Sequence, residues 1–129
     1  MALWCLWCGR LRAGWWRGGN SLIGDKARIL IRDADAVYVS AASAWEISIK
    51  VALGKLRTSR LPSEAVADSD FQTLPVTFEH AEAVLTLPAH HRDPFDRLIV
   101  AAAQVERLAV VSSDSQLRMY DVPLIDAQA

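Results

Sequence analysis

A chain of 129 residues is long enough for one domain with a substantial apolar core and short for two. Its composition, 52% hydrophobic and 22% charged, is that of a folded α/β protein and excludes a disordered chain. The formal net charge of −1 excludes a general attraction to nucleic acid, so any such binding requires a local group of basic side chains.

The beginning of the chain differs in composition from the rest. Residues 1–24 contain three arginines and no acidic residue, whereas the remainder carries 11 basic and all 15 acidic side chains. The first 19 residues also contain both cysteines and four of the five tryptophans. We therefore expect an atypical N-terminal segment at 1–19 and a folded domain at 20–129. No apolar run suits a secretory signal or a membrane span, so we expect a cytoplasmic protein that does not bind membranes.

The hydrophobic pattern from residue 22 onward predicts alternating helices and strands. Helices are predicted at 22–32, 43–53, 62–67, 77–85 and 93–107, and strands at 36–40, 71–76, 108–111 and 122–125. Because strands alternate with helices, the sheet should be mostly parallel and covered by helices on both faces. The predicted fold class is therefore α/β, with three layers.

Four acidic residues lie at junctions or ends of these predicted elements: Glu46, Asp93, Asp96 and Asp114. In open parallel sheets, functional sites form beyond the carboxyl ends of the strands, so these carboxylates are expected to converge at one edge. Carboxylates gathered in this way repel one another unless a cation neutralises them. Ligands that are all oxygen suit Mg²⁺ or Mn²⁺.

Each of these acids also has a purely structural explanation. Ser43 and Glu46 fit a capping box in which Glu46 is the third helical residue. Asp93 fits a helix N-cap, Asp96 complements the dipole of the same helix, and Asp114 could cap a short helix that follows it. Capping gives no reason for all four acids to lie at one edge of the sheet, which favours the metal site.

Basic and aromatic side chains accompany the acids. Lys50 is one turn after Glu46 and could pair with it or hold a phosphate. A basic rim that could bind a phosphodiester backbone, or be an ordinary solvated loop, consists of His90, His91, Arg92 and Arg97. Trp45 is expected to pack in the core.

Three stretches of the sequence resemble a known family. S-A-A-S-A-W-E-I-S-I-K at 40–50, followed by G-K-L at 54–56, is similar to the second motif of PIN-domain ribonucleases of the VapC toxin type. H-R-D-P-F-D-R-L at 91–98 resembles the third motif, and Ser113-Asp114 resembles the fourth. The resemblance covers roughly residues 20–126, so the expected PIN domain is 20–129.

This resemblance implies the partners and the activity of the chain. It implies a Mg²⁺- or Mn²⁺-dependent endoribonuclease toxin that cleaves RNA and is held inactive by a cognate VapB-type antitoxin. Operator DNA would be bound only through the antitoxin, and members of the family often form a homodimer.

The resemblance also implies roles for single residues. Glu46 and Asp96 would be metal ligands, and Asp93 and Asp114 would be further or water-bridged ligands at the same catalytic site. The metal would activate a water molecule and stabilise the leaving oxygen at the scissile phosphate. The candidate substrate-binding residues are Lys50, Arg92 and Arg97.

The chain departs from the family at its beginning. The family begins with a buried strand that ends in a metal-binding aspartate, shortly before a tryptophan pair. Here Trp15-Trp16 stands where that pair belongs, but residues 1–14 contain no acidic and no β-branched residue. A one-base shift of reading frame at Gly9-Arg10 would read GNC, an aspartate codon when N is A. We therefore expect a disrupted first strand and a chain that is poorly active or inactive.

Two alternatives remain open. A degenerate PIN module could bind its antitoxin without cleaving RNA. An unrelated Mg²⁺-dependent phosphohydrolase on a similar sheet would usually need a nucleophilic aspartate on its first strand, which this sequence lacks.

Overall fold

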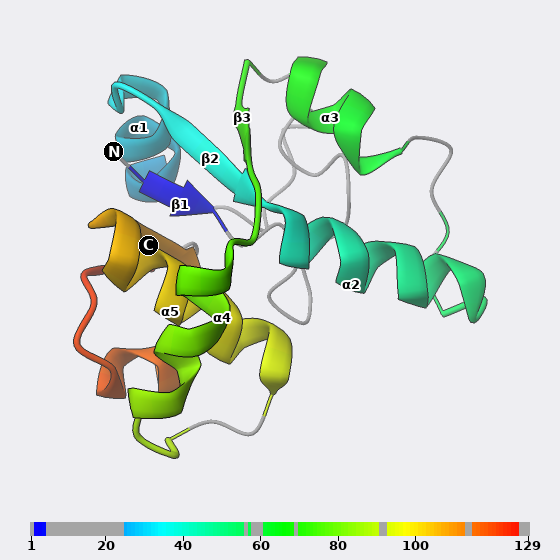
Figure 1. Ribbon diagram of the computed structural model, residues 1–129. Coiled ribbons are helices and arrows are strands. Elements are labelled where there is room, and N and C mark those ends of the chain that lie inside the picture. The colour runs from blue at the N-terminus through cyan, green and yellow to red at the C-terminus, as the bar shows by residue number, and fades with distance from the viewer. Residues whose placement is uncertain are drawn as a thin grey trace.

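Five parallel strands form the centre of the molecule (Figure 1). The computed structural model describes the backbone of 2–4 and the residues 25–55, 57, 61–68, 70–90, 93–112 and 115–126. The strands are β1 (Ala2–Trp4), β2 (Val37–Ser40), β3 (Gln72–Leu74), β4 (Ala109–Ser112) and β5 (Leu124–Asp126). Their order across the sheet is β3-β2-β1-β4-β5, and every neighbouring pair is parallel. The predicted parallel α/β sheet is confirmed.

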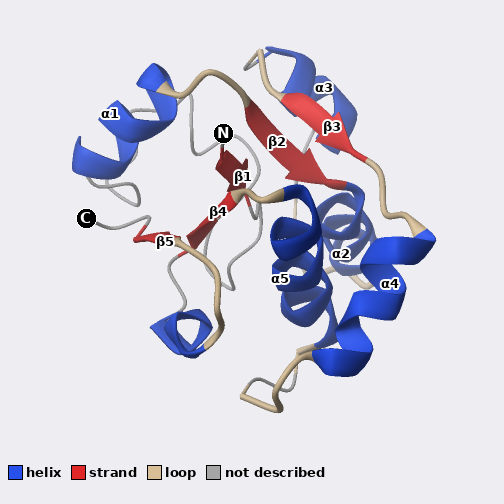
Figure 2. Cartoon of the chain, turned by 60° about the vertical axis from the view of Figure 1, so that its left-hand side comes forward, coloured by secondary structure: helices blue, strands red, loops and turns tan. Residues whose placement is uncertain are grey.

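Helices cover both faces of this sheet. The α-helices are α1 (Asp25–Asp33), α2 (Ala41–Ala52), α3 (Pro62–Asp68), α4 (Phe78–Ala83) and α5 (Pro94–Glu106), with 3-10 helices η1 (Val84–Thr86) and η2 (Ser115–Met119). Helix α1 lies on one face, and α4 and α5 lie side by side on the other (Figure 2). In the described part of the chain, no helix combines the length and the apolar character that crossing a membrane requires.

The central strand corrects one expectation from the sequence. We expected the first strand to be disrupted and the sheet to lack its central member, which is wrong. Ala2–Trp4 lies between β2 and β4, with Trp4 level with Val39 on one side and Val111 on the other. Strand propensity is a weak, context-dependent preference, and a place between two strands offers hydrogen bonds on both sides. The family's acidic residue is still missing, because Cys5 follows Trp4 in the sequence.

Helix α5 is fixed firmly against the sheet. Its residues 99–103 are all nearly inaccessible to solvent and belong to the main apolar cluster, together with Val110 and Val111 of β4. Because β4 follows α5 after a short turn and runs in the opposite direction, the first turn of α5 lies toward the carboxyl edge of the sheet. The helix therefore carries Asp93 and Asp96 to the edge where the sequence predicts a site.

His80 joins the beginning of α4 to the end of α5. Its ring is 1% exposed, and its Nδ1 accepts the Thr77 N–H at 3.3 Å while Thr77 Oγ1 accepts the His80 N–H at 3.2 Å. Since Nδ1 is an acceptor, Nε2 is the protonated nitrogen, and it donates to Glu106 Oε1 at 2.8 Å. One neutral histidine thus caps α4 and ties it to α5.

Replacing His80 by alanine should lower the free energy of unfolding by about 2 kcal/mol, because buried volume and two hydrogen bonds are lost together. Urea denaturation followed by circular dichroism measures the change. The matched control is Glu106→Gln, whose side chain is 42% exposed and can still accept from Nε2, so its effect should stay below about 0.5 kcal/mol. Equal losses in the two variants would contradict the role given to the buried ring.

Candidate metal centre

Helix α2 begins without a loop, and this changes the structural explanation of Glu46. Strand β2 ends at Ser40 and α2 starts at Ala41, so Ser40 is the N-cap and its side chain accepts the Ala42 N–H at 3.1 Å. The predicted capping box of Ser43 and Glu46 is wrong, because the helix starts earlier than Ser43. Glu46 lies more than one turn inside the helix, where it caps nothing.

The Glu46 carboxylate is buried and only half satisfied. The residue is 5% exposed, and Lys50 Nζ lies 3.3 Å from its Oε1, which is the i,i+4 pair anticipated from the sequence. Among the described residues, Oε2 is buried without a hydrogen-bond partner. Leaving a buried carboxylate oxygen unpaired is costly, so such an atom calls for an explanation by function.

The two aspartates of α5 lie where the sequence placed them. Asp93 is the N-cap, and its Oδ1 accepts the backbone N–H groups of Phe95 at 2.9 Å and Asp96 at 3.4 Å. Asp96 is in the first turn and only 8% exposed. The capping role of Asp93 is therefore confirmed. It does not exclude a second role, because Asp93 also lies close enough to Glu46 to act on its charge.

Two observations bring the beginning of α2 and the beginning of α5 together. The rings of Trp45 and Phe95 are in edge-to-face contact, with centroids 5.2 Å apart and planes at 69°. These rings directly precede Glu46 and Asp96 in the sequence. Burial raises the pKa of Glu46, the nearby Lys50 ammonium opposes that rise, and the Asp93 carboxylate adds to it. Glu46 and Asp93 therefore share one electrostatic neighbourhood, and the ring contact brings the turn that carries Asp96 close to α2.

The raised pKa of Glu46 predicts how the metal-free protein responds to pH. A carboxyl whose pKa is higher in the folded than in the unfolded state destabilises the fold once it ionises, so stability falls as pH rises above 4.5 through the raised pKa. Glu46→Gln removes this ionisation. We expect the metal-free variant to be at least as stable as the wild type at pH 7, with a smaller difference near pH 4. Urea denaturation in EDTA at pH 4 and pH 7 measures the free energy of unfolding of Glu46→Gln and of the wild type. If the variant lost stability relative to the wild type between pH 4 and pH 7, the prediction would be contradicted.

Two residues of the predicted basic rim, His90 and Arg97, lie in the described part of the chain. Arg97 donates to Pro88 O at 2.9 Å, to the Tyr120 hydroxyl at 3.3 Å and to Val84 O at 3.4 Å. The His90 ring also contacts Tyr120, with centroids 5.2 Å apart. Arg97 thus fastens the first turn of α5 to the η1 region and to the turn after η2. Its role as a substrate-binding residue stays a prediction.

Other predicted residues lie outside the described part of the chain: His91, Arg92 and Asp114. Among the described residues, no group of three or more histidine, cysteine, aspartate or glutamate side chains is placed to hold a metal ion. The donors present are all carboxylate oxygens, one of them an unpartnered buried atom, and these suit a hard cation such as Mg²⁺. The described acids therefore fit part of a metal site, and Asp114 is the remaining acid that the sequence offers for it.

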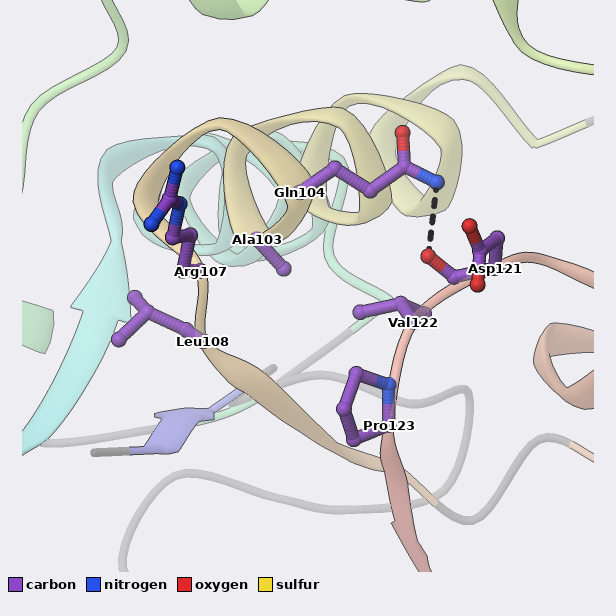
Figure 3. Close-up of a pocket in the computed structure, with 7 residues that line it drawn as sticks. All are labelled: Ala103, Gln104, Arg107, Leu108, Asp121, Val122 and Pro123. Atoms are coloured by element: carbon purple, nitrogen blue, oxygen red, sulfur yellow. Dashed lines mark hydrogen bonds between the residues drawn. The ribbon is translucent and has the colours of Figure 1, made fainter.

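A separate pocket lies at the other end of α5. It has a volume of about 450 Å³ and is lined by Ala103, Gln104, Arg107, Leu108, Asp121, Val122 and Pro123 (Figure 3). Gln104 Nε2 donates to Asp121 O at 3.1 Å across one side of it. The pocket is next to the starts of β4 and β5, and none of the candidate metal ligands lines it.

Comparisons with known proteins define the class. Residues 19–123 match the family described as PIN domain, which is more than half of the chain, so this protein belongs to the PIN-domain family. A toxin–antitoxin complex from Klebsiella pneumoniae contains a chain of the same fold, with 16% identity and a TM-score of 0.58. The VapBC2 complex of Rickettsia felis, bound to a DNA fragment from its promoter, gives 11% identity and a TM-score of 0.63. Each alignment covers 98% of both chains. No curated protein sequence matches.

Proposed function

We propose that this chain is a VapC-type toxin: a metal-dependent endoribonuclease whose activity is weak because its first strand lacks the family's aspartate. The observation that carries the proposal is the buried Glu46 carboxylate, which has one oxygen held by Lys50 and the other without a partner among the described residues. An orphaned oxygen on a carboxylate whose pKa is raised further by the charge of Asp93 suits a hard cation better than any structural role.

The candidate site residues have separate proposed roles in binding the metal and the RNA. Glu46 and Asp96 are the proposed metal ligands, and Asp93 and Asp114 are the further or water-bridged ones. When bound, Mg²⁺ or Mn²⁺ would activate a water molecule for attack on a phosphodiester and stabilise the charge on the leaving oxygen. Lys50 fixes the orientation of the Glu46 carboxylate, and Lys50, Arg92 and Arg97 are the proposed contacts to the RNA backbone.

The partner is proposed from the same resemblance. Both of the solved structures described above are toxin–antitoxin complexes, which supports a cognate VapB-type antitoxin as the partner of this chain. One of them contains promoter DNA, which is consistent with operator binding through the antitoxin. We further propose a cytoplasmic protein that forms a homodimer, as members of the family often do.

The test is RNA cleavage by the purified chain. Single-stranded RNA incubated with Mg²⁺ should be cut slowly, and EDTA should stop the cleavage. Fast, EDTA-sensitive cleavage would show that the missing aspartate is not needed. Cleavage that persists in EDTA, or that is unaffected by Glu46→Gln, would reject the metal-dependent mechanism.

A second candidate rests on the absence of any acid in residues 1–24. A chain that lacks one principal ligand could survive as a module that binds its antitoxin without cutting RNA. Co-expression distinguishes the two candidates: a soluble complex with the antitoxin, formed without divalent metal, together with no toxicity of the chain alone, favours the binding module.

A further inference from the structure

Trp45 does not pack in the core as its neighbours in the sequence suggested. It is 61% exposed, although it stands on α2 directly before the buried Glu46. Exposure of the largest apolar side chain is unfavourable unless something covers it in the working protein. The expected core role of Trp45 is therefore wrong, and its position needs another explanation.

The indole of Trp45 is placed at the rim of the candidate metal centre. It contacts the ring of Phe95, and Phe95 lies in the same turn as Asp93 and Asp96. An edge-to-face contact occupies at most one face of the indole, which agrees with the large exposed fraction of the residue. One flat aromatic face is thus open to solvent beside the acids.

Polar and charged groups lie close to Trp45 in the sequence of α2. The helix carries the exposed Ser48 and the Glu46–Lys50 ion pair within five positions of Trp45. The exposed apolar residues further along are Val51, at 39%, and Leu53 directly after the helix, at 62%. An aromatic face beside charged groups is typical of single-stranded nucleic acid sites, whereas protein interfaces have an apolar centre.

The charges of the described residues favour an additional, non-ionic source of binding energy. The chain has a net charge of −1, Lys50 is paired with Glu46, and Arg97 is bound to two backbone carbonyls and a hydroxyl. Binding through phosphate charges alone would therefore be weak at an acidic site. Stacking of a base on an aromatic side chain can supply the missing affinity without further cations.

We propose that Trp45, supported by Phe95, is the stacking platform for one base of a single-stranded RNA, next to the phosphate presented to Glu46 and Asp96. This inference rests on the proposed nuclease function and adds the residue that selects unpaired RNA. A base within a duplex is stacked on its neighbours and cannot present a face to Trp45, so the platform excludes double-stranded RNA.

The experiment measures binding of a short single-stranded RNA and of a series in which one base at a time is removed to leave an abasic site. Binding is followed by fluorescence anisotropy in Mg²⁺, with gels confirming that the RNA stays intact. For the wild-type chain, an abasic site at one position should weaken binding on the order of tenfold, with much smaller losses elsewhere. Trp45→Ala should weaken binding of the intact RNA by about the same factor. The affinity of this variant should no longer depend on the position of the abasic site.

Three further variants control for structure and for general apolar surface. Trp45→Phe keeps an aromatic face and should retain most of the affinity. Leu53→Ala removes a side chain directly after the same helix with 62% exposure, and Phe78→Ala removes an aromatic side chain of α4 with 87% exposure. Both controls should bind RNA like the wild type and keep the dependence on the abasic position.

Several results would overturn the proposal. Wild-type binding that is equal at all abasic positions, or Trp45→Ala binding that still depends on the position, excludes stacking at Trp45. Trp45→Ala could leave RNA binding unchanged but alter the mass of the oligomer in sedimentation or abolish antitoxin binding. That result would make Trp45 a protein contact. If cleavage and metal binding still require Glu46 in any of these cases, only the stacking platform fails. If the chain binds neither metal nor RNA, the proposed function fails with it.

Discussion

An aspartate placed after β1 should raise Mg²⁺-dependent RNA cleavage by this chain about 100-fold, the scale of effect that one missing electrostatic group has at a catalytic centre. Strand β1 already occupies the central position, level with Val39 of β2 and Val111 of β4. Strand β1 therefore runs toward the carboxyl edge of the sheet, and the sequence lacks an acid after it. The variant to make is Cys5→Asp, because Cys5 directly follows the strand in the sequence.

Two controls separate charge from other effects of that substitution. The asparagine of Cys5→Asn has nearly the same shape as the aspartate of Cys5→Asp but carries no charge. This variant should leave cleavage at the level of the starting chain. Ser63→Asp adds the same charge at an exposed position of α3 and should also leave cleavage unchanged. Initial rates of cleavage of one single-stranded RNA, with and without EDTA, measure all three variants. Equal rates for Cys5→Asp and Cys5→Asn would contradict the account of the missing ligand.

Glu46→Gln in the Cys5→Asp background should remove the whole gain, a loss of about 100-fold or more. The variant keeps the size of the side chain but not the charge that a hard cation requires, and the glutamine has no capping role to lose because Ser40 caps α2. Lys50→Met is the matched variant. It removes the partner of Oε1 and should reduce cleavage only about 5-fold, since Lys50 orients the carboxylate without binding metal.

The comparison of these two variants is sharper than either alone. If Glu46 acted only as the partner of Lys50, removing either member of the pair would have the same effect. Far-ultraviolet circular dichroism and urea denaturation show whether each variant is folded. Cleavage by Glu46→Gln within a few fold of its parent would remove Glu46 from the metal site.

The general architecture follows from the sequence because periodicity and turn residues are local signals. The sequence predicts Asp93 as the N-cap of α5, and in the structure its Oδ1 accepts two backbone N–H groups of the first turn. The start of α2 was misplaced because Ser40 and Ser43 are both good N-caps, and only the direct passage from β2 into the helix selects the first. Because α2 starts at Ala41 rather than at residue 43, Glu46 lies inside the helix, where capping cannot explain it.

The parts that could not be predicted depend on contacts between distant segments. Arg97 resembles a phosphate ligand in the sequence, but η1 and Tyr120 supply the acceptors that occupy it. Trp45 was expected in the core because it is apolar and next to buried residues, whereas its side of α2 is only partly covered by Phe95. For β1, no local signal exists, and its place is set by the strands on either side.

The capping of α5 and the proposed metal centre are compatible, because Asp93 would serve both. Asp93 uses Oδ1 for the backbone N–H groups of the first turn, and its charge also raises the pKa of Glu46. A cation between these carboxylates would relieve their repulsion while leaving the cap intact. The bound metal should accordingly stabilise the fold, by about 2.7 kcal/mol at a concentration 100 times its dissociation constant.

The most direct measurement is Mn²⁺ binding to the folded chain, followed by electron paramagnetic resonance of the free ion. If carboxylates from α2 and α5 share one cation, the wild type should show saturable binding that both Glu46→Gln and Asp96→Asn abolish and that Lys50→Met retains. Absence of saturable Mn²⁺ binding in the wild type and in Cys5→Asp, or binding unchanged in both acid variants, would contradict a shared metal centre.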